Sequence, residues 1–202
     1  MLVLVCITLA AFASPQEGAL AQEPGTILLR VDGRPVLRYR HEHVPYKHYI
    51  DRLTTPSGVN VLLDAPSDHL HHHGLMFAVK LDGTNFWEEA EAPGRQVGEA
   101  PQGNGDSIAQ ELRWESSDGT VIAREQREVR LHSSPEASAT LLTWTTRLEA
   151  VGIAETVLTG AHYHGLGLRF VRDMDGASEV FSTSSDPGEV VRRAPDLILG
   201  SW

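Results

Sequence analysis

Short apolar runs separated by turn residues dominate the chain from residue 22 onward, and sustained helical periodicity is scarce. The clearest alternation covers residues 140–148, where every second side chain belongs to a mostly apolar face. Side chains two positions apart share one face of a β-strand, so this period predicts a half-buried strand. Leu166, Leu168 and Phe170 repeat the alternation near the end of the chain and predict another strand.

Three turn signals containing Asp-Gly divide other apolar runs into predicted β-hairpins. Residues 27–31 and 36–39 flank Asp32-Gly33, residues 76–81 and 85–87 flank Asp82-Gly83, and residues 108–114 and 121–123 flank a Ser-Asp-Gly turn at 117–119. Asp-Gly between apolar runs is a strong hairpin signal because both positions accept a positive φ. Several strands at this spacing predict an all-β fold, an antiparallel β-sandwich, rather than βαβ units.

Two segments depart from this pattern. Residues 88–105 are acidic and rich in Pro, Gly and Ala, so we expect an exposed loop there. A loop of this length inside a compact domain is typically functional or mobile. Residues 197–199 resemble the start of a strand just before the sequence stops at Trp202. We therefore expect residues 22–202 to form a single β-sandwich domain that is truncated at its C-terminus.

The N-terminal apolar run, residues 2–13, is shorter than the roughly 20 residues that a membrane-spanning helix needs. Small residues at the positions before the cut fit signal-peptide cleavage after Ala13 or after Ala21, and we prefer Ala21. Residues 1–21 are thus predicted to be a signal peptide, with a buried N-terminal strand or helix as the alternative. Cleavage would remove Cys6, the single cysteine, and send a chain without a membrane span to the periplasm or the cell exterior.

Composition and net charge limit the classes of binding partner that we expect. The chain of 202 residues is 41% hydrophobic and 22% charged, which is typical of a soluble protein large enough to bury a core. It carries 17 Lys+Arg against 27 Asp+Glu, a formal net charge of −10 at pH 7. Nucleic-acid and anionic-membrane binding start from a basic surface, so we expect neither partner.

Ten histidines supply the candidate chemistry, and most of them lie in three groups. The groups are His41, His43 and His48; Asp68 with His69, His71, His72 and His73; and His162 with His164 around Tyr163. On a strand, the two imidazoles of a His-x-His pair lie on one face. Two such pairs on neighbouring strands can surround a divalent ion, or a neutral imidazole beside a carboxylate can act as an acid or base near pH 7.

The group at 68–73 is the strongest candidate, because ionisable residues are costly to bury unpaired and an apolar run follows at 75–79. Strict alternation puts His69 and His71 on one face and His72 on the other. All three therefore serve one site only if the strand has not yet begun there. The sequence has no His-Glu-x-x-His helix, Gly-x-Ser-x-Gly elbow or phosphate loop, which argues against serine-nucleophile and nucleotide-binding functions.

Residues 47–58, 68–75 and 163–170, together with Asp82-Gly83 and Phe86-Trp87, resemble the PmoA-like family of exported bacterial proteins. The element Asp-His-x-His-His-x-Gly-Leu at 68–75 is its most specific part. This chain departs from the family pattern with Leu70 in place of Pro and His73 in place of Arg. The resemblance implies a large β-sandwich similar to the mutarotase-like supersandwich, in a domain that continues beyond Trp202.

Together these features lead us to expect an exported carbohydrate-active enzyme with isomerase, lyase or hydrolase chemistry on a sugar or glycoside. The candidate catalytic residues are Asp68, His69, His71, His72, His162 and His164, with Asp68 orienting one imidazole. The candidate substrate-binding residues are Arg169, Tyr163 and His48. We expect Arg169 to bind a substrate hydroxyl or carboxylate.

Two other function classes remain open. A non-catalytic carbohydrate-binding module would place exposed aromatic residues such as Trp87, Trp114 or Tyr163 along one face. A metal-binding protein or metalloenzyme would hold one divalent ion on His69, His71 and His164, although the known ligand spacings fit poorly.

Overall fold

The computed structural model describes the backbone of residues 2–9 and the complete residues 23–42, 44–132, 139–152, 155–161 and 163–174. Within these ranges the secondary structure is nearly all β, and the helical content is a short 3₁₀ turn, η1 (Arg172–Met174). We find no helix in them with the length and apolar character needed to cross a membrane. These observations confirm the predicted all-β class.

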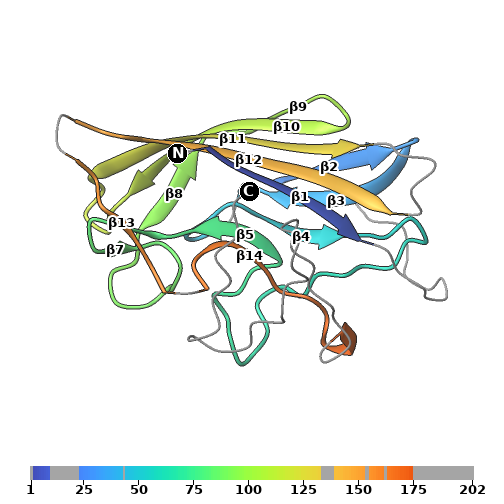
Figure 1. Cartoon of the computed structure of the whole chain (residues 1–202), viewed down its shortest axis with the longest axis horizontal. Helices are drawn as coiled ribbons and strands as arrows, with labels where there is room; N and C mark the ends of the chain where they lie inside the picture. The colour runs from blue at the N-terminus through green and yellow to red at the C-terminus, as the bar shows by residue number, and fades with distance from the viewer. Residues whose placement is uncertain are drawn as a thin grey trace, which may run out of the picture.

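Two antiparallel sheets form the body of the molecule (Figure 1). The first sheet has the order β1 (Leu2–Leu9), β12 (Thr140–Ala150), β11 (Val121–His132), β10 (Ser107–Glu115) and β8 (Arg95–Gly98), and β9 (Gln102–Gly103) also pairs with β10. The second has the order β14 (Gly165–Leu168), β5 (Leu75–Ala78), β4 (Tyr49–Leu53), β3 (Arg34–Arg40) and β2 (Thr26–Val31). A small third sheet joins β13 (Leu158–Thr159), β6 (Lys80–Leu81) and β7 (Thr84–Asn85).

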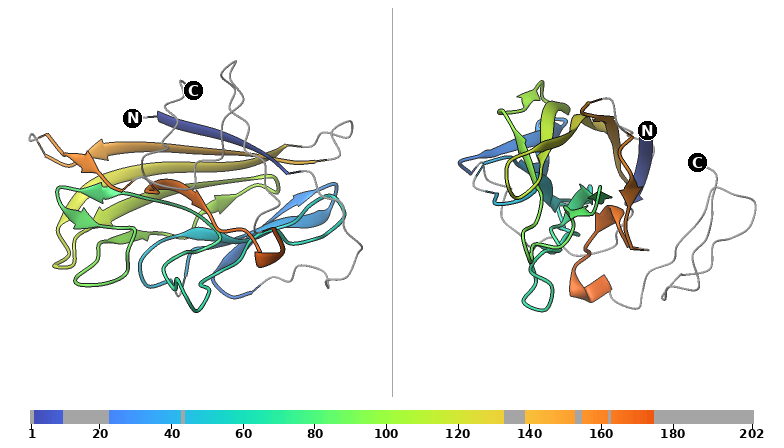
Figure 2. Two further views of the ribbon diagram at one scale, coloured as in Figure 1. Left: turned by 60° about the horizontal axis from the view of Figure 1, so that its bottom comes forward. Right: turned by 90° about the vertical axis from the view of Figure 1, so that its left-hand side faces the viewer.

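The hydrophobic core lies between the two large sheets. Figure 2 shows the arrangement of these sheets in two further views. Alternating residues of β10, β11 and β12 point inward and include the fully buried Trp114 and Trp144. Phe77 of β5 meets Trp114 edge-on, with 5.8 Å between the ring centroids. Apolar burial of this kind is the main force that joins the sheets and confirms the sandwich-like packing expected from the alternation.

The predicted hairpins form at the expected turns. Asp32 and Gly33 have φ angles of 50° and 78°, and Asp82 and Gly83 have φ angles of 47° and 81°. Two consecutive positive φ values define the primed turn that suits the twist of a tight hairpin. The strands paired there are β2 with β3 and β6 with β7.

The loop expected over residues 88–105 is interrupted by structure. Residues 95–98 form β8 and residues 102–103 form β9, and both pair with β10. Gln96 of β8 is buried and donates from Nε2 to the carbonyl oxygen of Phe77 at 2.7 Å. The prediction was wrong there because an edge strand with an inward glutamine carries no apolar alternation.

The N-terminal run lies at an edge of the first sheet, where the backbone of β1 pairs with β12 from Leu2–Arg147 to Leu9–Thr140. Signal-peptide cleavage acts on the exported precursor, so this pairing leaves the expected cleavage after Ala21 a prediction. Residues 197–199, where the sequence predicts another strand, lie outside the described residues.

Candidate functional site

The loop between β4 and β5 brings three histidine rings together. His69 N–H donates to Pro66 O at 2.8 Å and His72 N–H donates to His69 O at 3.0 Å, so the segment folds as successive turns. The centroid of the His72 ring lies 4.7 Å from that of His69 and 4.5 Å from that of His71. Strand β5 begins at Leu75, after all three, which is the condition under which they can serve one site.

An aromatic row continues from these rings along the segments after β7 and before β14. The ring centroid of Trp87 lies 6.0 Å from that of His72 and 5.3 Å from that of His164, which stacks on it. Tyr163 packs against Trp87 and His164 with centroid distances of 5.8 and 5.1 Å. The structure therefore brings two of the predicted groups together, while His43 and His162 lie outside the described residues.

Two glycines make this row possible by close approach. A Cβ atom on Gly167 would lie 2.4 Å from the Trp87 ring, and one on Gly160 would lie 2.6 Å from Nδ1 of His164. Both positions require a residue without a side chain, because contacts this short are far inside van der Waals distance.

Asp68 holds one edge of the group. Its carboxylate lies 3.3 Å from Nδ1 of His69, 3.2 Å from the guanidinium of Arg172 and 3.6 Å from that of Arg169. The hydrogen bond from its own backbone N–H lowers the pKa of Asp68; desolvation opposes this shift, and the His69 and Arg172 side chains add to it. Asp68 thus lies beside one imidazole and Arg169 lies next to Asp68, while their expected roles stay predictions.

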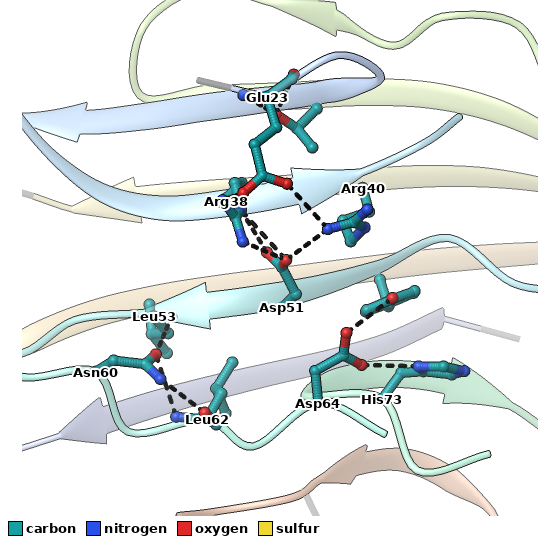
Figure 3. A network of polar contacts seen from close by, with 11 residues as sticks. Glu23, Arg38, Arg40, Asp51, Leu53, Asn60, Leu62, Asp64 and His73 are labelled. Atoms are coloured by element: carbon teal, nitrogen blue, oxygen red, sulfur yellow. Dashed lines mark hydrogen bonds and ion pairs between the residues drawn. The ribbon is translucent and has the colours of Figure 1, made fainter. Parts of the chain in front are cut away.

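A buried layer of charges lies beneath the loop. His73 bonds Asp64 through Nδ1 at 2.8 Å and Glu89 through Nε2 at 3.0 Å. Tyr49 stacks on the His73 ring at 4.3 Å and donates its hydroxyl to Asp64 at 3.1 Å. Figure 3 shows Asp64 and His73 below a second ion network, that of Glu23, Arg38, Arg40 and Asp51. Burial lowers the pKa of His73, but the hydrogen bonds to the two carboxylates outweigh it and raise that pKa.

Lys47 joins the buried layer to the two segments that carry the rings. Its Nζ lies 2.6 Å from Glu89 Oε1 and donates to the carbonyl oxygens of Trp87 and His71 at 2.9 and 3.2 Å. Burial lowers its pKa, and Glu89 partly restores it. Sequence reasoning missed Lys47, Glu89 and Asp64 as site residues, although Lys47 begins one of the segments that carry the family resemblance.

Burial favours the neutral form of the His71 and His72 imidazoles. Burial, followed by the charges of His71 and His69, lowers the pKa of His72 to about 4. Burial and the charge of Lys47 also lower the pKa of His71. In the part of the chain that the structure describes, the ring nitrogens of His71 and His72 make no protein hydrogen bond. Both rings therefore offer lone pairs to a ligand near pH 7.

No three His, Cys, Asp or Glu side chains among the described residues are arranged to hold a metal ion. The predicted ligands His69, His71 and His164 are divided, because Trp87 lies between the histidine loop and His164. One divalent ion at these residues stays a prediction.

His48, a predicted substrate-binding residue, lies in the interior between the sheets. Its Nδ1 is 3.2 Å from Gln110 Oε1, and its ring packs near Tyr39 at 6.4 Å. Its neighbour Lys47 contacts the histidine loop, whereas no described contact joins His48 to the cluster.

We expect His48 to make the protein sensitive to acid. Burial, then the charge of Arg127, lowers the pKa of His48 to about 3 from its ordinary 6.5. Between these values the unfolded chain binds a proton that the folded chain does not, so stability falls as the pH drops. His72 acts in the same direction. In His48→Gln the slope of the free energy of unfolding against pH should decrease by up to about 1.4 kcal/mol per pH unit over this window.

Urea denaturation at a series of pH values measures this slope. His132→Gln is the matched control, because His132 is exposed on β11, and it should keep the wild-type slope. An unchanged slope in His48→Gln would assign the acid sensitivity to other groups.

Of the three aromatic residues named for a carbohydrate-binding module, two are buried and one is partly exposed. Trp87 and Trp114 are 3% and 0% exposed, so neither can form an exposed ligand platform. They are core residues because each packs among other rings. Tyr163 is 45% exposed and is the member of the three that a ligand can reach.

A separate hollow of about 660 Å³ lies against β10, β11 and β12 and contains no histidine. Two arginines of its lining, Arg113 and Arg147, pair with Glu115 at 3.0 Å and Glu149 at 2.7 Å, which lie outside the hollow. We place the candidate site at the histidine loop, where neutral imidazoles, an aromatic row and buried charges converge.

Fold and site together define an all-β protein whose polar site lies on loops at one sheet. The chain belongs to a family of unknown function (DUF6807), whose model matches residues 26–198. No curated protein and no solved structure shows a significant match to it. The family description states no activity, so the resemblance to PmoA-like proteins stays a prediction.

Proposed function

We propose that the protein is an exported carbohydrate-active enzyme that uses the histidine loop for acid–base chemistry on a sugar or glycoside. The observation that carries this proposal is the meeting of the His69, His71 and His72 rings with the aromatic row of Trp87, His164 and Tyr163. Sites for small polar ligands combine aromatic surface with a few fixed polar groups. Here the half-exposed ring of Tyr163 supplies the aromatic surface, because Trp87 is buried, and the imidazoles supply the polar groups.

The residues divide into roles. His71 and His72 accept a proton, because their lowered pKa values keep them neutral at the pH where the substrate is bound. Asp68 orients His69 through the 3.3 Å contact with Nδ1. The Tyr163 hydroxyl donates to Glu88 at 3.2 Å, and its half-exposed ring supplies an apolar face for a sugar.

A carbohydrate panel followed by product analysis tests the proposal. In His71→Ala and His72→Ala, turnover should fall by about 10²–10⁴-fold while sugar binding survives, because a general base contributes rate rather than affinity. His132→Ala, on the outer face of β11, is the matched control and should keep full turnover.

The same variants separate the other classes. Loss of binding without any turnover in the wild type would identify a carbohydrate-binding module. One bound equivalent of a divalent metal in elemental analysis, lost in His71→Ala and in His164→Ala, would replace acid–base chemistry by a metal site. A wild-type protein that binds no sugar and turns none over would refute the proposal.

A further inference from the structure

Two guanidinium groups converge on one carboxylate at the edge of the histidine loop. Arg172 Nη2 lies 3.2 Å from Asp68 Oδ1, and Arg169 Nη2 lies 3.6 Å from Asp68 Oδ2. Each guanidinium carries five N–H donors in a planar fork, so one contact each leaves most of their donors available to a second planar anion.

Main-chain hydrogen bonds hold the backbone of Arg169 and Arg172 in place. Arg169 N–H donates to Gly74 O at 2.7 Å, and Arg169 O accepts from Leu63 N–H at 2.8 Å. Arg172 begins η1, which is closed by the hydrogen bond from Met174 N–H to Val171 O at 3.0 Å. In Figure 2, η1 lies on the same side of the molecule as the loop that follows β4. These main-chain bonds order the backbone at both positions, and the contacts with Asp68 hold the two guanidiniums near each other.

The charges of the site leave this edge positive. In the buried layer, Lys47 pairs with Glu89, and His73 bridges the carboxylates of Glu89 and Asp64. Glu88 lies across the aromatic row, where Asn85 and Tyr163 bond it. At the edge, by contrast, the single carboxylate of Asp68 faces two guanidiniums.

Asp173 follows Arg172 in the chain and forms no ion pair with either guanidinium among the described residues. One positive charge is therefore uncompensated beside the neutral imidazoles of the histidine loop.

We propose that Arg169 and Arg172 bind the carboxylate of an acidic sugar, so that the substrate class of this site is uronate-containing carbohydrate. This inference rests on the proposed function and narrows it. Asp68 contacts both guanidiniums, one through each carboxylate oxygen, so the two arginines lie close enough together to share one planar anion. Charge-assisted contacts from two arginines favour the carboxylate of a uronate over the neutral hydroxymethyl group of an uncharged sugar.

Isothermal titration of the whole protein compares methyl glucuronide with methyl glucoside, which differ at the carboxylate. We expect the glucuronide to bind at least about tenfold more tightly. This preference should shrink in 0.5 M salt, because the pair is partly exposed. In Arg169→Gln and Arg172→Gln the ratio of the two dissociation constants should fall toward one. Arg130→Gln, an exposed arginine on β11 paired with Glu128, should keep the wild-type ratio.

The wild-type comparison needs no variant, so it holds even if one substitution impairs folding. Equal affinity for the two glycosides would overturn the uronate assignment and leave the proposed function intact. Binding of neither glycoside would overturn the uronate assignment, and the carbohydrate panel then decides the proposed function. Acetate bound as tightly as the glucuronide would identify a simple anion site, and a stronger preference for glucose 6-sulfate would reject the carboxylate; each result overturns the inference.

Discussion

Lys47→Met should lower the free energy of unfolding by about 3–5 kcal/mol, because it removes a buried cation and leaves the Glu89 carboxylate with His73 alone. Lys47 is 2% exposed and is the cation next to Glu89 in the layer beneath the site. Methionine preserves the length of the side chain but donates no hydrogen bond. The carbonyl oxygens of His71 and Trp87 therefore lose a shared donor, and both segments of the site should loosen.

Urea denaturation followed by tryptophan fluorescence measures this loss. Lys80→Met is the matched control, since Lys80 is half-buried on β6, and it should change stability by about 0.5 kcal/mol or less. The double variant Lys47→Met with Glu89→Gln should recover part of the loss, because the orphaned charge is then gone. Equal effects of Lys47→Met and Lys80→Met would contradict a structural role for the Lys47–Glu89 pair.

Arg127→Met should have a similar effect, about 3–5 kcal/mol, from the opposite side of the sandwich. Arg127 binds Glu125 through Nε at 2.7 Å and through Nη2 at 2.8 Å, and Glu125 is 1% exposed. Arg127 also donates to the Tyr39 hydroxyl at 3.1 Å and to His48 O at 2.8 Å. It therefore crosses the core from β11 to the second sheet. Its removal leaves the buried Glu125 carboxylate with no cation and only the donors of Trp114 and Thr146 among the described residues.

The neighbouring exposed pair provides the comparison. Arg130 binds Glu128 at 2.6 Å on the same strand, yet Arg130→Met should cost at most about 1 kcal/mol because water screens that pair. In Arg127→Met with Glu125→Gln, the loss should be smaller than in Arg127→Met alone. Chemical denaturation of these three variants and of the wild type gives the differences. A loss of stability in Arg130→Met as large as that in Arg127→Met would show that burial is not the cause.

The strand pattern predicted β12 well and β11 poorly, and the reason lies in their inward residues. On β12 the inward positions include Leu142 and Trp144, so apolar alternation reveals the strand. On β11 they include Glu125 and Arg127, whose charges cancel in the core, and the alternation disappears from the sequence. A hydrophobic period detects a buried face only while that face is apolar.

The candidate site was predictable as a set of ring positions but not as a supported structure. The density of histidines after Asp68 pointed to the loop, and the apolar run that begins at Leu75 placed it before a strand. Lys47 and Glu89 carry no such signal, because an isolated lysine or glutamate is ordinarily a surface residue. Their pairing joins positions 42 residues apart in the sequence, which depends on how the loops pack.

The histidine loop is anchored by its backbone, since Lys47 binds the carbonyl oxygen of His71 and not its ring. The turn contacts of His69 and His72 are likewise made by main-chain atoms. The loop is thus supported by main-chain atoms, while the proposed ligand recognition belongs to the side chains of the same residues. The side chains at positions 69, 71 and 72 can therefore be replaced together, by evolution or by design, while the main-chain contacts that anchor the loop stay unchanged.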